Sequence, residues 1–227
     1  MTNFPFDTVG FDLDGTLLDT FRDLGEAVNH ALELGGFERV SVESSKDLIG
    51  GGAKIMLLQA VEKQGGMPDD EFRKLYKQML AYYADHNADF SRPYPHAVET
   101  LEALKARGIK LVVVTNKFEE FARSVLTQLD LIEYFETVIG GDSMGKGPDG
   151  KYLSKPHPDP IQEAQRIGGG GPIAFIGDST YDVNAAKAAG VPVIAVTYGY
   201  HDKDPHQMGA EAVIDSLDQL IPTLEAL

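Results

Sequence analysis

The chain has 227 residues, of which 20 are basic and 35 acidic, giving a formal net charge of −15 at pH 7. Such an acidic protein repels the nucleic-acid backbone, which excludes broad DNA or RNA binding, and any anionic ligand needs a local positive group. The absence of cysteine excludes disulfides and thiolate metal sites. The sequence shows neither a secretory leader pattern nor a membrane-length apolar run, so we expect a soluble, cytoplasmic protein.

The first predicted element is the apolar run TVGFDLD at 8–14, which lacks alternation, as a strand covered on both faces does. It ends in two carboxylates, Asp12 and Asp14, followed at once by Gly15 and Thr16. Carboxylates this close repel each other unless a positive group lies between them. The end of this strand therefore points to a bound cation.

Helical patterns alone follow this strand until about Pro93. They comprise Leu24 to Leu32 with an end at Gly35 and Gly36, Ile55 to Lys63, and Phe72 to Tyr83. A run of helices that interrupts an α/β pattern indicates a separate inserted unit. We therefore expect an α-helical cap domain at 20–92, inserted into a catalytic core formed by 1–19 and 93–227.

Beyond Pro93, helical and strand patterns alternate. The predicted strands are IKLVVVTNK at 109–117, TVIGG at 137–141, IAFIGDS at 173–179 and VPVIAVTYG at 191–199. Helices are predicted from Phe118 to Leu129 and from Tyr181 to a stop at Gly190. This alternation predicts an α/β core with a doubly wound, Rossmann-like parallel sheet.

Polar residues gather where three of these strands end. Asp12-Leu13-Asp14, Thr115-Asn116-Lys117 and Gly177-Asp178-Ser179 occupy equivalent positions, and Asp182 follows the last of them. Each motif alone has an ordinary explanation, because Asp, Asn, Gly and Ser favour turns and helix caps. Ligands of open parallel sheets, however, bind beyond the carboxyl ends of the strands. Three such motifs at equivalent ends favour one shared site.

Magnesium is the cation that these residue types suit. Mg²⁺ prefers oxygen ligands and leaves room for a phosphate oxygen. Asp12 and Asp178 can supply carboxylate oxygens, and a backbone carbonyl near Asp14 can add another. Lys155 and backbone N–H groups could hold the remaining oxygens of a phosphate.

Four short stretches in this order, DLDGT, TN, KP and GDSTYD, resemble the signatures of the haloacid dehalogenase superfamily of phosphohydrolases. The resemblance covers nearly the whole chain. The longer stretches FDLDGTLLDT, VVVTNK, KPHPDP, FIGDSTYDVNAAKAAG and VTYGY are similar to a bacterial subfamily, the phosphoglycolate phosphatases. The resemblance implies a Mg²⁺-dependent phosphomonoesterase that converts 2-phosphoglycolate to glycolate and phosphate.

The resemblance also implies a role for each matching residue. Asp12 would be the nucleophile that forms an aspartyl-phosphate, and Asp14 would be the general acid and then the general base. Both would contribute to the metal site. Thr115 and Asn116 would donate hydrogen bonds to the transferring phosphoryl group.

Further residues would complete this site. Lys155 would neutralise the phosphoryl group, and Lys146 and Lys151 of the same loop are expected to be solvated. Asp178 would complete the Mg²⁺ site, while Ser179 and Asp182 would support it from behind.

The substrate would also contact the predicted cap. The stretch LIGGGAKIML at 48–57 places Gly51 and Gly52 before a helix, where their N–H groups could bind a carboxylate with help from Lys54. The same stretch is equally compatible with an ordinary interhelical turn. The substrate-binding assignment of these three residues depends on the subfamily resemblance.

Three alternatives remain open. The same core could serve a sugar phosphomutase similar to β-phosphoglucomutase, or a phosphatase of another small phosphometabolite. A signalling receiver phosphorylated on aspartate would share the acidic residues, hydroxyl, lysine and Mg²⁺, but it would be shorter and lack the helical insertion. A dehalogenase is disfavoured, because a halide leaving group needs no acid such as Asp14. The sequence does not indicate an oligomeric state.

Overall fold

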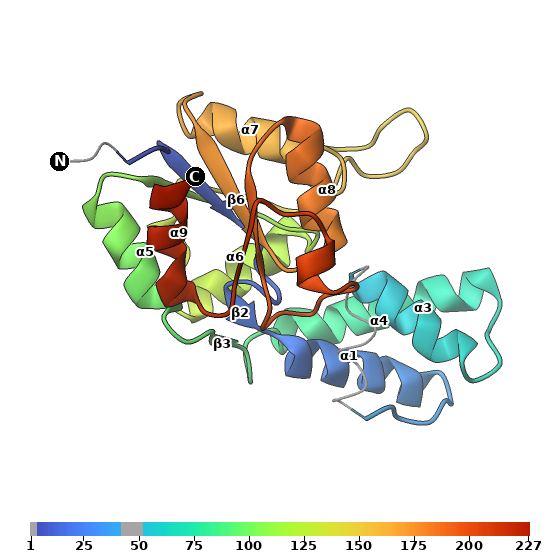
Figure 1. The fold of residues 1–227 in the computed structure, drawn as a ribbon. Helices are drawn as coiled ribbons and strands as arrows, with labels where there is room; N and C mark the ends of the chain where they lie inside the picture. The colour runs from blue at the N-terminus through green and yellow to red at the C-terminus, as the bar shows by residue number, and fades with distance from the viewer. Residues whose placement is uncertain (1–3, 42–51) are drawn as a thin grey trace. The chain divides into compact units, whose positions relative to one another are not determined.

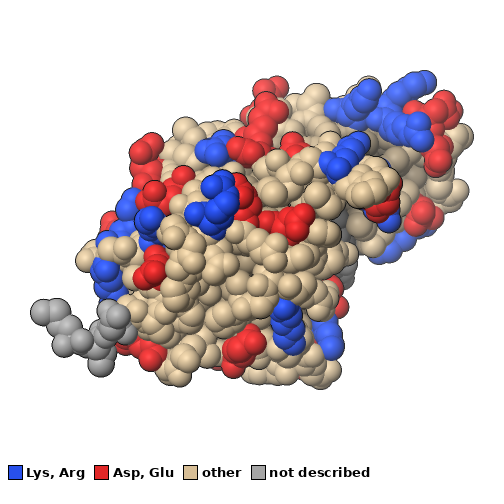
Figure 2. All heavy atoms as spheres, turned by 90° about the horizontal axis from the view of Figure 1, so that it is seen from above, with Lys and Arg blue, Asp and Glu red and all other residues tan. Residues whose placement is uncertain are grey.

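The computed structural model describes residues 4–41 and 52–227. The chain divides into two compact units, Met1–Asp19 with Pro93–Leu227 and Thr20–Arg92 (Figure 1). We call the first the core unit and the second the helical unit. None of the helices in the described residues combines the length and apolar character that a membrane span needs. On the face shown in Figure 2, basic side chains are interspersed with acidic ones.

The core unit is built on a six-stranded sheet with the order β5-β4-β1-β6-β7-β8. All neighbouring strands pair in parallel. The strands are β1 (Thr8–Phe11), β4 (Lys110–Val114), β5 (Thr137–Ile139), β6 (Ile173–Gly177), β7 (Val193–Val196) and β8 (Ala212–Ile214). The predicted parallel α/β fold is confirmed. The apolar runs did not indicate β8, because three residues at a sheet edge are too few to make a recognisable pattern.

Helices cover both faces of this sheet (Figure 1). One face carries α7 and α8, and the other carries α5, α6 and α9. Their bounds are α5 (Ala97–Ala106), α6 (Glu119–Gln128), α7 (Asp159–Ile167), α8 (Thr180–Ala189) and α9 (Leu220–Ala226), with 3₁₀ turns η2 (Ile132–Tyr134), η3 (Pro205–Gln207) and η4 (Leu217–Gln219). Burial on both faces explains why the strands are uniformly apolar.

The sheet register brings the polar strand ends together. Phe11, the last residue of β1, lies opposite Val113 of β4 and Ile176 of β6. The segments that follow these three strands therefore begin at the same level of the sheet. The order also reverses around β1, which is where ligands bind in open α/β sheets.

The helical unit contains three described helices, α1 (Phe21–Leu34), α3 (Ala53–Glu62) and α4 (Asp69–Asp85). Helix α1 packs against both α3 and α4. Buried Asp23 on α1 accepts hydrogen bonds from Ser91 N–H at 2.8 Å and Ser91 Oγ at 2.6 Å, which ties the end of this unit to its first helix. The short strands β2 (Leu18–Asp19) and β3 (Arg92–Pro93) lie where the chain passes between the units.

Candidate active site

The first part of the site is the turn that follows β1. Asp12 extends the strand by donating its N–H to Ile176 O at 2.9 Å, and its Oδ1 accepts the N–H of Leu13 at 2.7 Å. Gly15 adopts φ = 82°, which a side chain would disfavour. Its N–H donates to Leu18 O at 2.9 Å and closes the turn. The Asp12 side chain is thus held by the backbone N–H of the next residue and is 12% exposed.

The segment after β4 supplies the second part. The Thr115 Oγ1 accepts the N–H of Lys117 at 3.2 Å, so the hydroxyl hydrogen can be donated elsewhere. Asn116 donates its Nδ2–H to Lys155 O at 3.0 Å. That amide therefore positions the Lys155 backbone, while the buried Asn116 Oδ1 has no partner among the described residues. The predicted contact of Asn116 with a phosphoryl group stays a prediction.

The third part of the site is the segment after β6, which carries Asp178 and is supported by Asp182 in the first turn of α8. Ser179 and Asp182 form a capping box, in which the Asp182 Oδ2 accepts the N–H and hydroxyl of Ser179 at 3.0 and 2.6 Å. The same oxygen accepts the N–H of Asp178 at 3.2 Å. Gly177 leaves room for this arrangement, since a Cβ there would overlap the Asp182 side chain. Asp182 thus fixes the direction of the segment that carries Asp178.

Asp178 is held on a second side by the loop after β7. Its Oδ2 accepts the N–H of Tyr200 at 2.6 Å, and its Oδ1 accepts the hydroxyl of Thr16 at 3.3 Å. Side chains at Gly15 and Gly199 would collide with the Asp178 side chain. The two glycines therefore allow the β1 turn and the 199–200 segment to close around this carboxylate.

Lys155 joins the first and third parts by ion pairs, and its carbonyl is held by Asn116 of the second part. Its Nζ lies 2.9 Å from Asp12 Oδ1 and 2.5 Å from Asp182 Oδ1, with the side chain only 1% exposed. Burial would lower the pKa of Lys155, but Asp12 and Asp182 together raise it above its ordinary value, so the amine stays charged. Burial raises the pKa of Asp12 to about 6 against the opposing effect of Lys155, and burial with Asp182 nearby raises that of Asp178.

Lys117 is a site residue that the sequence reasoning did not assign. Its Nζ lies 2.8 Å from both Oδ1 and Oδ2 of Asp14, with the two residues contributed by the ends of β4 and β1. The signal available in the sequence was its place in the Thr115-Asn116-Lys117 segment at a strand end. Each of the paired carboxylates Asp12 and Asp14 therefore has its own ammonium partner.

The carboxylates fit a divalent cation. Asp12, Asp178 and Asp182 each offer an oxygen, and these oxygens lie within 4.8 Å of one another. Hard cations such as Mg²⁺ take carboxylate oxygens, and the raised pKa values of Asp12 and Asp178 are expected where acidic groups are crowded and buried. Both oxygens of Asp178 and both of Asp182 already accept hydrogen bonds, so these bonds do not distinguish the two residues. Asp182 is fully buried, whereas Asp12 and Asp178 keep some exposure, which makes Asp12 and Asp178 the more accessible ligands.

Two of the predicted substrate-binding residues lie in the helical unit. Gly52 precedes α3 with φ = 83°, and Lys54 is in the first turn of that helix. Gly51 lies outside the described residues. A contact between these residues and the substrate stays a prediction.

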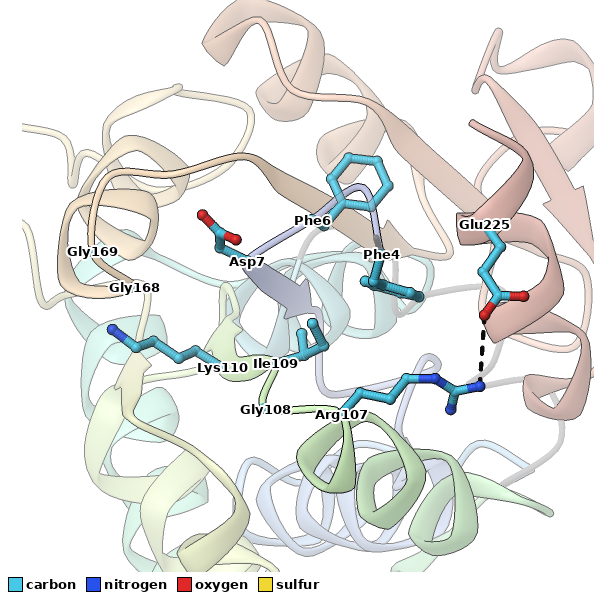
Figure 3. Close-up of a pocket in the computed structure, with 10 residues that line it drawn as sticks. All are labelled: Phe4, Phe6, Asp7, Arg107, Gly108, Ile109, Lys110, Gly168, Gly169 and Glu225. Atoms are coloured by element: carbon cyan, nitrogen blue, oxygen red, sulfur yellow. Dashed lines mark ion pairs between the residues drawn. The ribbon is translucent and has the colours of Figure 1, made fainter. Parts of the chain in front are cut away.

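A cavity of about 620 Å³ lies elsewhere in the core unit (Figure 3). It is lined by residues that precede or begin β1 and β4, such as Phe6 and Lys110, and by the turn at Gly168 and Gly169. The candidate site lies at the carboxyl ends of these strands, whereas this cavity lies at their amino ends. It is therefore not part of the candidate site.

Comparison with known proteins identifies the hydrolase family to which a chain with this fold belongs. A family model for haloacid dehalogenase-like hydrolases matches residues 9–196. A phosphoglycolate phosphatase of Agrobacterium fabrum is 35% identical, over 99% of this chain and 95% of that protein. One from Escherichia coli K12 is 36% identical, over 95% and 91%. The crystal structure of a predicted phosphoglycolate phosphatase from Haemophilus somnus is 33% identical, covers 96% of this chain and 97% of that chain, and has a TM-score of 0.86.

The chain therefore belongs to the haloacid dehalogenase-like hydrolase family, and it is a phosphatase. The predicted family and enzyme class are confirmed.

Proposed function

We propose that this protein hydrolyses 2-phosphoglycolate to glycolate and phosphate in a Mg²⁺-dependent reaction through an aspartyl-phosphate. The main support is that Asp12, Lys155 and Asp178 lie together at the carboxyl ends of the adjacent strands β1 and β6. The Nζ of Lys155 is 2.9 Å from Asp12 Oδ1. The substrate is supported by the relatives, several of which are named phosphoglycolate phosphatases.

In the first step, an oxygen of Asp12 attacks phosphorus. The bond between phosphorus and the substrate alkoxide breaks, and its electron pair leaves with the alkoxide oxygen. Asp14 donates a proton to that oxygen, which releases glycolate. Lys155 and the hydroxyl of Thr115 stabilise the oxygens of the transferring group.

In the second step, water attacks the phosphorus of the aspartyl-phosphate. Asp14, now a carboxylate, takes a proton from the water. The bond between phosphorus and the Asp12 oxygen breaks, which regenerates the Asp12 carboxylate and releases phosphate. Ser179 and Asp182 hold the segment that carries Asp178 in place throughout.

Mg²⁺ would be held by Asp12, Asp178 and a backbone carbonyl near Asp14, and when bound it supplies positive charge that an anionic substrate needs in so acidic a protein. We propose further that the helical unit acts as the cap, with Gly51, Gly52 and Lys54 directed to the carboxylate of the substrate.

A panel of small phosphoesters assayed with Mg²⁺ tests this proposal. We expect sustained phosphate release, fastest with 2-phosphoglycolate, and loss of activity after chelation with recovery on adding Mg²⁺. A much faster reaction with another phosphoester would show that 2-phosphoglycolate is not the substrate. Isomerisation of a sugar phosphate would show that the enzyme is a phosphomutase. Release that stops at one equivalent per protein would indicate a phospho-accepting signalling domain. Full activity after metal removal would contradict the Mg²⁺ site.

A further inference from the structure

We infer that Lys117 is a positioning residue for Asp14, the acid–base group of the proposed reaction; this inference rests on the proposed function. The ammonium of Lys117 lies 2.8 Å from each oxygen of the Asp14 carboxylate. Contact with both oxygens restricts rotation of the carboxylate as well as its position. The direction of Asp14 is therefore set by a residue from another strand.

The burial of this pair argues for a geometric role. The side chain of Lys117 is 4% exposed and that of Asp14 is 17% exposed. A buried ion pair seldom stabilises a fold more than apolar residues of similar size would, because both charges lose hydration. The pair is therefore better explained by the orientation that it imposes on a reacting group than by its effect on stability.

The backbone that carries Lys117 is itself held on both sides. Its N–H donates to Thr115 Oγ1 at 3.2 Å, and its carbonyl accepts the N–H of Gly141 at 2.8 Å. Gly140 and Gly141 pack so closely on residues 116–119 that a Cβ at either position would overlap their backbone. The ammonium thus projects from a segment with little freedom to move.

Asp14 needs such a partner because of its neighbours. Asp12 is paired with Lys155 at 2.9 Å, two residues before Asp14. Without Lys117, the Asp14 carboxylate would be attracted to Lys155 or to a cation held by Asp12 and Asp178. That movement would take it away from the leaving-group oxygen. Lys117 therefore keeps the Asp14 carboxylate away from Asp12, so that Asp12 can act as the nucleophile and Asp14 as the acid–base group.

Lys117→Met tests the inference when it is assayed with an alkyl phosphate and with an aryl phosphate. We expect kcat on the alkyl substrate to fall by about 10²-fold, with a much smaller loss on the aryl substrate, because an acidic phenol leaves without a proton donor. KM should change little. Lys117→Arg, which keeps a bidentate cation, should recover part of the loss. Lys110→Met is the matched control, since Lys110 is an exposed lysine of the same β4 region.

A double-mutant cycle separates positioning from direct contact with substrate. In an Asp14→Asn background, Lys117→Met should cause little further loss on the alkyl substrate, on which each single change has a large effect, since its target is gone. Additive losses, or equal losses on alkyl and aryl substrates, would overturn the inference. If Lys117→Met does not fold, Lys117→Arg and Lys117→Gln enter the same cycle.

Crystal structures of the wild type and Lys117→Met provide a readout that does not depend on activity. We expect the Asp14 carboxylate to rotate in the variant while Asp12 and Lys155 stay in place. An unchanged Asp14 would overturn the inference. Failure of the wild type to release phosphate from any phosphoester would refute the proposed function instead, and the crystal comparison would still decide whether Lys117 positions Asp14.

Discussion

Lys155 forms an ion pair with Asp12, its Nζ 2.9 Å from Asp12 Oδ1, although the two residues lie far apart in the chain. The same ammonium reaches Asp182 Oδ1 at 2.5 Å. One buried cation therefore links the proposed nucleophile to the residue that organises the start of α8. The positive charge of Lys155 thereby offsets the repulsion between carboxylates that lie close together.

Asp12→Asn should abolish turnover, because a neutral amide is a poor nucleophile and a weak metal ligand. We expect kcat to fall by at least about 10⁴-fold. Phosphate release measures the loss, and circular dichroism verifies that the fold is kept. Retention of more than trace activity in a folded variant would show that another group attacks phosphorus.

Asp14→Asn should impair alkyl phosphates far more than aryl phosphates. An alkoxide is a poor leaving group unless it is protonated, and general acid catalysis of this kind contributes about 10²–10⁴-fold. The ratio of kcat on the two substrate types measures the effect in both wild type and variant. Equal losses on the two types would argue against Asp14 as the acid.

Mg²⁺ should stabilise the protein more at high pH than at low pH. Burial raises the pKa of Asp12 from 3.8 to about 6, so in the metal-free protein the fold favours the protonated carboxyl. The metal-free protein therefore loses stability as pH rises from about 4 through 6. Mg²⁺ binds the ionised form and reverses this loss.

The measurement is the shift in Tm on adding Mg²⁺, at about pH 5 and about pH 8. Asp178→Asn is the control, since it removes a proposed ligand and should lose most of the shift at either pH. An equal shift in the wild type at both values would contradict binding to these carboxylates.

Gly199→Ala should weaken Mg²⁺ binding without changing any charge. A Cβ at this position would overlap the Cβ of Asp178 and the carbonyl of Gly15. The backbone must shift, and we expect a stability loss of about 1–3 kcal/mol together with a smaller Tm response to Mg²⁺. Gly147→Ala is the comparison, because its Cβ would first meet the flexible end of Leu153 at 3.2 Å. Similar behaviour of the two variants would refute this account.

Much of the core could be predicted from the sequence. Uniformly apolar runs indicated β1, β4, β5, β6 and β7, because strands covered on both faces need apolar residues at every position. The edge strand β8 was missed, since its pairing depends on β7 rather than on a pattern of its own. The proposed roles of the site residues, and the role of the helical unit as a cap, stay predictions.

The residue types at the strand ends can be read from the sequence, and their order was sufficient to identify the family. The pairing of charges follows from the fold, because contacts such as that between Lys117 and Asp14 depend on the parallel register of β4 with β1. Asn116 shows the same limit, as its amide holds the Lys155 carbonyl, a partner that no local pattern could indicate. Local chemistry is encoded by neighbours in the chain, whereas the partner of each charge is set by which strands the sheet brings side by side.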